Sequence, residues 1–345
     1  VSRSFVMRVV VAAAILALAL LLWTWRHVLL LIFASLLIAV GLNSLASWIS
    51  NRTPLSRGWA LAVAVIFIGL IVIGAGWLFG AQVGAQLTEL MSRLPEAMAK
   101  LQASVAASPM GRDVVKQIQD GAASQGAEGA LGALGRVGGW TMSFAGAALD
   151  ALVVVIGAIF LTVSPKRYRD GLLSLFPKAA RTDMSKALDE CARSLSRWLL
   201  GTLLSMVAVG VSIGVVLGLL GVPAFLALAL IAGLAQFLPL IGPLIAAVPA
   251  ILLAMTVGWD TAIYVALAFF AVSQMEANLL SPLIQKKAVS LEPALTLFAI
   301  LAMGILLGPL GVLFAVPLTV VAVIFLRRFY IRGTLGDDSA DRAKD

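Results

Sequence analysis

The sequence predicts an all-α polytopic membrane protein with six to eight transmembrane helices, and three observations carry this prediction. Apolar residues are 61% of the chain and charged residues 12%, whereas soluble domains are about half apolar and about a quarter charged. No ionisable side chain occurs between Arg197 and Asp260, a length that no single element of a soluble core accommodates. A Gly-Pro motif recurs in two long uncharged stretches, and we interpret these stretches as two broken, re-entrant hairpins.

Six mainly apolar runs place the simple spans. They cover residues 9–25, 28–48, 59–81, 140–163, 198–221 and 260–280. All eight tryptophans fall near the ends of these runs, as the aromatic belts at the two membrane surfaces require. Because Arg26-His27 separates the first run from another apolar run, we expect a retained helical hairpin here rather than a cleaved leader.

The two broken segments repeat the same sequence pattern. Gly242-Pro243 precedes Gly308-Pro309 by 66 residues, and Pro249 precedes Pro317 by 68. Each segment is 34 residues long. As one straight helix it would measure about 50 Å, which is longer than a hydrocarbon core of about 30 Å. Two full crossings, however, need about 40 residues, so the segment is too short for them. A pair of half-length helices fits this length. The segments are Pro223–Thr256 and Pro293–Leu326.

Basic residues indicate the orientation. The N-terminal end, the 49–58 loop and the 164–197 segment carry the basic excess, so we expect them in the cytoplasm, whereas the 82–139 loop has five basic and five acidic residues and suits the opposite side. Lys286-Lys287 faces the cytoplasm if the first broken segment re-enters from outside, and faces outward if both segments cross fully. The positive-inside rule favours re-entry, which makes the two span-plus-hairpin units an inverted repeat.

We expect five regions along the chain. They are N-terminal helices at 1–82, an extracytoplasmic helical arm with a flexible return at 83–139, a fourth span with a basic amphipathic segment at 140–197, a core of duplicated span-plus-hairpin units at 198–330, and a disordered cytoplasmic tail at 331–345. The arm has an apolar stripe that contacts a neighbouring subunit, covers the core, or belongs to a simple connector. In the basic segment, apolar residues from Met184 to Trp198 recur at helical spacing and predict a helix lying at the membrane interface.

Two carboxylates occur within apolar spans, where ionisable groups are costly and therefore candidates for function. Glu276 comes near the end of the 260–280 span, with Gln274 and Asn278 on another face of the same helix. Since its neutral form is tolerated in an apolar setting, Glu276 could carry a proton; alternatively it pairs with Lys286 or Lys287 at the headgroups. Asp150 lies in the fourth span, where it could equally be a snorkelling or inter-subunit contact.

The composition excludes several classes of chemistry. Cys191 is the only cysteine and His27 the only histidine, so we expect structural roles for both and neither a disulfide nor a Cys/His metal site. The Gly-Lys dipeptide of phosphate-binding loops does not occur, and there is no recognisable pairing of nucleophile and base. We therefore expect no enzyme activity and no cofactor, and the net charge of +8 reflects topology rather than a nucleic acid partner.

Several motifs in residues 160–330 resemble the autoinducer-2 exporter family of bacterial permeases. They are Pro165-Lys166-Arg167-Tyr168-Arg169, the Gly201–Gly210 span, Leu220-Gly221-Val222-Pro223, Phe237–Pro243, Glu276–Pro282, Gly308–Gly311 and Ala315-Val316-Pro317. The resemblance implies an inner-membrane transporter, with export of the signal autoinducer-2 described for some relatives and sodium/proton antiport proposed for others. Many members have a glycine where this chain has Gln285-Lys286-Lys287, so the substrate does not follow from the fold.

We expect a secondary transporter in the bacterial cytoplasmic membrane, with both termini cytoplasmic, that exports a small polar solute resembling autoinducer-2. A monovalent cation (sodium or lithium)/proton antiporter is the alternative, and a passive pore would leave the duplicated breaks unexplained. Membrane lipids and further copies of the chain are the expected partners. The residues expected along the transport path are Gln236, Pro239, Gly242, Pro243, Gln274, Glu276, Asn278, Gly308, Pro309, Gly311 and Pro317, with Glu276 and Asp150 as candidates for coupling. Close helix packing is the competing explanation for the glycines.

Overall fold

The computed structural model describes residues 20–70, 140–238, 241–280 and 292–332, together with isolated positions between 7 and 93. Within these ranges the regular structure is helical and contains no strand, as the sequence predicts. The chain forms two compact units. One consists of Val1–Leu45, Asp150–Ser196 and Leu291–Asp345, and the other of Ala46–Leu149 and Arg197–Ser290.

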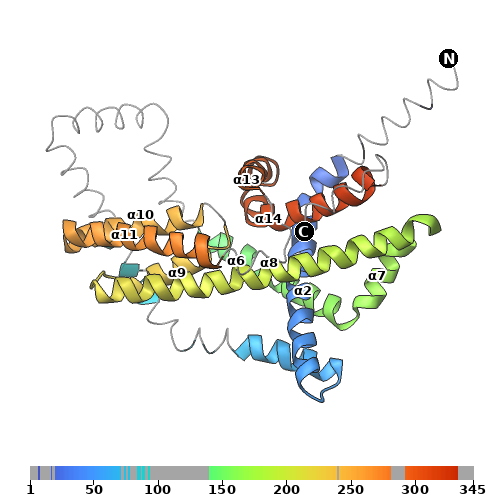
Figure 1. The fold of residues 1–345 in the computed structure, drawn as a ribbon, viewed down its shortest axis with the longest axis horizontal. Coiled ribbons are helices and arrows are strands. Elements are labelled where there is room, and N and C mark those ends of the chain that lie inside the picture. The colour runs from blue at the N-terminus through green and yellow to red at the C-terminus, as the bar shows by residue number, and fades with distance from the viewer. Residues whose placement is uncertain are drawn as a thin grey trace. The chain divides into compact units, whose positions relative to one another are not determined.

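The first unit contains α2, most of α6, α7, the first part of α8, α13, α14 and η2 (Figure 1). Their bounds are Arg26–Arg52 for α2, Trp140–Val163 for α6, Pro165–Ser174 for α7, Lys178–Leu219 for α8, Pro293–Leu307 for α13, Pro309–Phe325 for α14 and Leu326–Arg332 for η2. Helices α13 and α14 pack against each other. Helices α2 and α6 approach closely at Gly157, where a Cβ atom would lie 2.7 Å from Ser35 Oγ. Small residues let membrane helices come this near.

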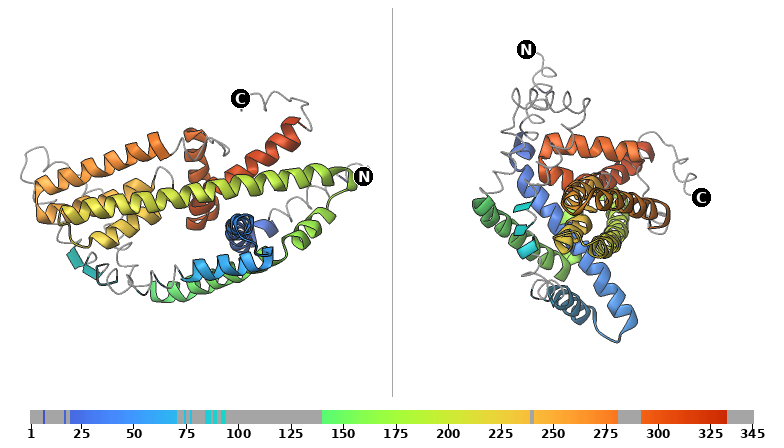
Figure 2. Two further views of the ribbon diagram at one scale, coloured as in Figure 1. Left: turned by 60° about the horizontal axis from the view of Figure 1, so that its bottom comes forward. Right: turned by 90° about the vertical axis from the view of Figure 1, so that its left-hand side faces the viewer.

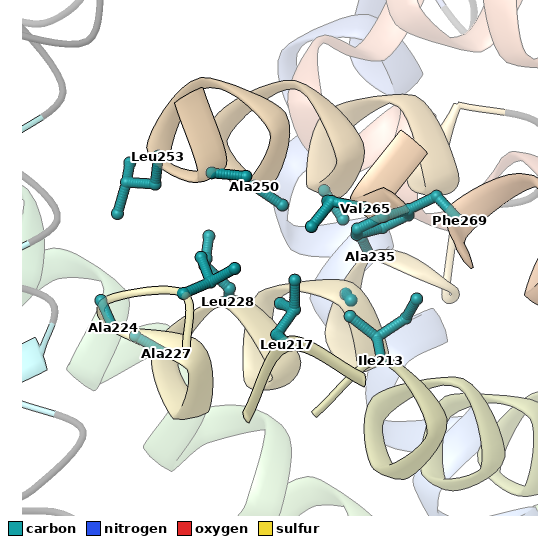
Figure 3. Packing of buried hydrophobic residues seen from close by; sticks show 14 of the residues in the cluster. Ile213, Leu217, Ala224, Ala227, Leu228, Ala235, Ala250, Leu253, Val265 and Phe269 are labelled. Atoms are coloured by element: carbon teal, nitrogen blue, oxygen red, sulfur yellow. The ribbon is translucent and has the colours of Figure 1, made fainter. Parts of the chain in front are cut away.

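The second unit is built around the remainder of α8 with α9, α10, α11 and η1, whose arrangement can be followed from two further directions in Figure 2. The bounds are Phe225–Ala235 for α9, Gly242–Val257 for α10, Trp259–Met275 for α11 and Glu276–Leu280 for η1. Its core is formed by apolar side chains from all four α-helices. Figure 3 shows Ile213 and Leu217 of α8, Leu228 of α9, and Val265 of α11 in this cluster.

The two Gly-Pro motifs occupy the same structural place. Each begins the second helix of a packed helix pair: Gly242 is the first residue of α10, and Pro309 is the first residue of α14. Proline suits this position because a backbone N–H group in the first turn has no hydrogen-bond partner within the helix, so nothing is lost when proline lacks that group. Gly308 has a φ of 71°, which glycine adopts without a steric penalty. The sequence repeat is therefore also a repeat of helix, break and helix.

One glycine in each helix pair, Gly242 and Gly311, holds the two helices at close range. A Cβ atom on Gly242 would lie 2.0 Å from the carbonyl oxygen of Ala235, and one on Gly311 would lie 2.1 Å from that of Met303. Backbone cannot yield to such a contact without moving a helix. Packing is thus a sufficient reason for glycine at both positions.

The helix lengths refine the expected spans. Among the described residues, three helices are long and apolar enough to cross a membrane: Arg26–Arg52, Lys178–Leu219 and Pro309–Ile331. A fourth candidate joins the apolar part of α6 to α7 across an 88° bend. The short helices α9 and α10 have 11 and 16 residues, about 16 and 24 Å, so each is shorter than a bilayer core of about 30 Å.

Helix α8 differs from the two elements expected there. The basic segment and the fifth span form one continuous helix of 42 residues, because no glycine or proline interrupts the chain where the composition changes. The stripe that includes Met184, Cys191 and Leu195 is buried, while Arg193 and Arg197 are exposed. Two contacts hold the N-terminal part of α8 to its neighbours. Ser196 Oγ donates a hydrogen bond to Ser44 Oγ at 2.9 Å, and Arg328 Nη1 lies 3.5 Å from Glu190 Oε2.

Some predictions concern residues outside the described ranges. Most of the first span, nearly all of the 83–139 arm, the Lys286-Lys287 pair and the C-terminal tail belong here. One described residue of the arm does reach the second unit's core. Gln86 Oε1 accepts hydrogen bonds from the backbone N–H groups of Leu226 at 2.9 Å and Ala227 at 3.3 Å, and so satisfies donors that the first turn of α9 leaves free.

Substitution of Gly242 by alanine should destabilise the protein. The new Cβ would collide with the Ala235 carbonyl, and overpacking of this kind costs about 1–3 kcal/mol. We expect a lower midpoint of thermal unfolding in detergent. Gly69→Ala is the matched control, because nothing lies within 4 Å of the position of its Cβ; equal midpoints for the two variants would contradict the packing role.

Candidate functional site

The carboxyl group of Glu276 is held by two polar side chains from other helices of the second unit. Gln236, at the end of α9, donates a hydrogen bond from Nε2 to Glu276 Oε2, and the Ser205 hydroxyl of α8 donates a second. Gln236 and Ser205 are buried and Glu276 is half-buried. Three helices that are separate in sequence thus meet at one carboxylate.

Local backbone geometry explains why these groups point inward. Helix α9 ends at Ala235, and turns at Gln236 and Phe237 lead into the break before α10. Trp198 packs edge-on against Phe237 with ring centroids 5.4 Å apart, which fixes this turn beside α8. Glu276 is the first residue of the π-helical turn η1, and such widened turns commonly occur at functional sites.

A small cavity adjoins the carboxylate. Its volume is about 10 Å³, and its walls are mostly apolar side chains of α8, α9, α10 and α11, with Gln236, Ser273 and Glu276 as the polar groups and Pro243 at the start of α10. This is room for about one water molecule. In this conformation the cavity is too small for a larger solute, which could enter it only if the surrounding helices moved apart.

The remaining polar residues predicted near Glu276 lie elsewhere. Gln274 and Asn278 are exposed, and Asn278 Nδ2 donates to the Gln274 backbone carbonyl at 2.9 Å. Both residues lie two positions from Glu276 along the helix, so their side chains point in other directions than Glu276 and away from the cavity. Pro239 lies outside the described residues.

Ser205 and Ser273 are the site residues that sequence reasoning missed. Each is a hydroxyl residue within a largely apolar helical stretch, which is a signal that could have drawn attention to them. A serine can also satisfy its hydroxyl on its own helix backbone, so the pattern alone does not separate a site residue from a packing residue.

The motif of the second hairpin lies in the first unit, beside a wider cleft. This cleft has a volume of about 410 Å³ and is lined by Arg26, His27 and Leu30 of α2 together with the turn around Gly308 and Pro309. The Arg26 guanidinium donates to the Leu306 carbonyl at 3.4 Å. Pro317 is fully buried within α14, where it contributes to packing.

Asp150 pairs with the only histidine of the chain. His27 Nε2 lies 3.2 Å from each carboxyl oxygen of Asp150, with side-chain exposures of 55% and 38%. The pair links α2 to α6, and exposed pairs of this kind contribute about 0–1 kcal/mol. A structural role for His27 is expected from the sequence, but its partner Asp150 is not. No group of three or more His, Cys, Asp or Glu side chains that could hold a metal ion occurs among the described residues.

Replacing Gln236 by leucine should destabilise the protein by about 1.5–3 kcal/mol, the usual range for a hydrogen bond to a charged group. The physical reason is that the half-buried Glu276 carboxylate would lose one of its two donors. Thermal unfolding in detergent measures the effect, with Gln274→Leu, an exposed position, as the matched control. Replacing both partners of a hydrogen bond by apolar groups is nearly neutral, so the double variant Gln236→Leu/Glu276→Leu should recover most of the lost stability. A double variant as unstable as Gln236→Leu would contradict the pairing.

Comparison with known proteins identifies relatives along almost the whole chain. The AI-2E family transporter pattern matches residues 11–331. A Mycobacterium tuberculosis protein named "Putative transport protein MT0215" is 26% identical over 318 residues, which are 89% of this chain and 84% of that protein.

Two proteins of Bacillus subtilis are also similar. "Putative transport protein YrrI" is 36% identical over 155 residues, 45% of this chain and 44% of that protein. "Putative transport protein YueF" is 23% identical over 275 residues, 77% of this chain and 74% of that protein. The match to YrrI therefore spans less than half of that relative, whereas the family pattern includes both helix pairs and Glu276. The chain belongs to the AI-2E transporter family.

Proposed function

We propose that this protein is a secondary transporter of the bacterial cytoplasmic membrane that exports a small polar organic solute similar to autoinducer-2. The observation that carries the proposal is the Glu276 carboxyl group, bound by Gln236 and Ser205 beside a closed cavity at the break between α9 and α10. Polar groups at a helix break near the middle of a bilayer are the usual form of a transporter's binding site. Family membership supports transport, and the resemblance to autoinducer-2 exporters supports this solute class.

Glu276 could couple the solute to protons. An ionised carboxylate is costly in an apolar setting, while the neutral acid is tolerated. Gln236 and Ser205 offset this cost only while the site is closed around the carboxylate. Opening of the helices toward one side would expose Glu276 to water and let it exchange a proton, so protonation and opening are linked.

The proposed topology has both termini in the cytoplasm and two inverted hairpins. Helices α9 and α10 are each too short to cross, which supports re-entry from outside. The second hairpin enters from the cytoplasm, and its outgoing helix is long enough to cross. Since Arg26 marks the predicted outer end of α2, its bond to Leu306 supports a turn at Gly308 that reaches that level.

Antiport of sodium or lithium against protons is the second candidate function. Two observations favour it. Glu276 is the one carboxylate among the residues that line the cavity. The cavity has room for about one water molecule, which is closer to the size of a small ion than to that of an organic solute. The two functions differ in what moves with the proton, so the same preparation can separate them.

In proteoliposomes, Glu276→Gln should still exchange labelled autoinducer-2 at equal concentrations but should no longer accumulate it when a pH difference is imposed. Glutamine keeps the shape of the side chain and one acceptor oxygen, but it does not titrate. Asp260→Asn, at an exposed position in the first turn of α11, is the matched control. Unaltered accumulation by Glu276→Gln would contradict coupling, and sodium-driven proton movement without solute flux would favour the antiporter.

Topology can be checked with single cysteines in a Cys191→Ala background. If the first hairpin re-enters from outside, a cysteine at Ala288 faces the cytoplasm and should resist a membrane-impermeant thiol reagent added to intact cells. A cysteine at Ala106, in the predicted outer arm, should react readily. Equal reaction at the two positions would instead indicate that both hairpins cross completely.

A further inference from the structure

Helix α7 has an exposed apolar stripe that nothing in its own unit covers. Tyr168, Leu172 and Leu175 follow one another at positions i, i+4 and i+7, so they share one side of the helix and its C-terminal turn. Their exposures are 47%, 43% and 78%. Lys166 and Arg167, at the start of the same helix, are exposed as well. The helix is therefore apolar along one side, and two basic side chains are exposed in its first turn.

The packing of α7 on α8 fixes the direction of this stripe. Arg169 Nη2 donates to Ser185 Oγ at 2.6 Å and to Asp189 Oδ2 at 2.7 Å. Arg181 of α8 donates to the carbonyls of Ser174 and Phe176, at 3.2 and 3.0 Å. The middle and the C-terminal end of α7 are thus held to α8, and the apolar stripe lies about a quarter turn round the helix from Arg169.

The bend between α6 and α7 then determines what the stripe meets. Helix α6 presents lipid-compatible side chains such as Leu152, Ile156 and Phe160, all exposed, and ends at Val163. At Ser164-Pro165 the chain turns by 88°. A helix at a right angle to a membrane span, and too polar to enter hydrocarbon, lies along the membrane surface.

We propose that α7 is a surface anchor that binds the anionic lipids of the cytoplasmic leaflet. Tyr168, Leu172 and Leu175 insert at the boundary of the acyl chains, while Lys166 and Arg167 extend along the surface to reach lipid phosphates. Basic residues near a negatively charged leaflet attract it electrostatically. Through Arg169 and Arg181, α7 holds the basic half of α8 at the lipid surface.

The experiment places a lipid-sensitive fluorophore on the stripe of the full-length protein. Leu175→Cys in a Cys191→Ala background is labelled with NBD and reconstituted into nanodiscs, one set of phosphatidylcholine alone and one in which phosphatidylglycerol replaces about a third of the lipid. Quenching by brominated acyl chains reports contact with lipid. Asp170→Cys, an exposed position on the polar side of α7, is the matched control.

We expect several-fold stronger quenching at Leu175 than at Asp170 when phosphatidylglycerol is present, and weaker quenching at Leu175 in phosphatidylcholine alone. The double substitution Lys166→Gln/Arg167→Gln should remove the dependence on phosphatidylglycerol but keep the protein folded, because neither side chain holds α7 to α8. Equal quenching in both lipid mixtures would overturn the anionic-lipid assignment. A blue-shifted but unquenched fluorophore at Leu175 would show that protein, such as a second copy of the chain, covers the stripe instead.

Discussion

A bilayer offers no hydrogen-bond partner to a backbone N–H, a carbonyl or a carboxylate, and each part of this structure reflects that constraint. Long helices satisfy their own backbone groups, so α2 and α8 need only apolar surfaces toward lipid. Breaks need more. The free donors at the start of α9 are bonded by Gln86, which comes from a distant part of the chain. The helix α10 begins at Gly242-Pro243, where the proline has no donor to satisfy.

Close packing at glycine and hydrogen bonding at Glu276 are two consequences of one arrangement. Gly242 lets the start of α10 approach the end of α9 to within backbone contact. That approach places Pro243 on the wall of the cavity, next to Gln236 and Glu276. A bulkier residue at position 242 would separate the helices and also enlarge the cavity, so the steric requirement and the closed state of the site are physically linked.

In the first unit, ion pairs between side chains join the helices. Arg169 and Arg328 pair with Asp189 and Glu190, which are adjacent on α8. They connect α7 and η2 to the same turn of one long helix. Both ion pairs therefore hold a neighbouring element to the basic half of α8.

The helices and their breaks could be predicted from local sequence. Apolar runs indicated helices, and the repeated Gly-Pro motifs marked the starts of α10 and α14, because proline and glycine act on the backbone at their own positions. Continuity of α8 across residue 197 was not predicted, since a change from basic to apolar composition resembles a boundary whether or not the backbone bends there. The 88° turn after Val163 was missed for the opposite reason: the motif around Pro165 gives a helix start but not an angle.

By itself the sequence determined that this chain is a helical membrane protein, that its two helix pairs share one pattern, and that Glu276 is a candidate for function. These follow from composition, from spacing along the chain and from the cost of a charge in lipid. Only the tertiary structure decided that Gln236, forty residues away in sequence, bonds to Glu276, that Gln274 and Asn278 do not, and that His27 pairs with Asp150. The reason is that hydrogen bonds between helices depend on which faces meet, and helix rotation and packing angle are set by the whole core rather than by any local run of residues.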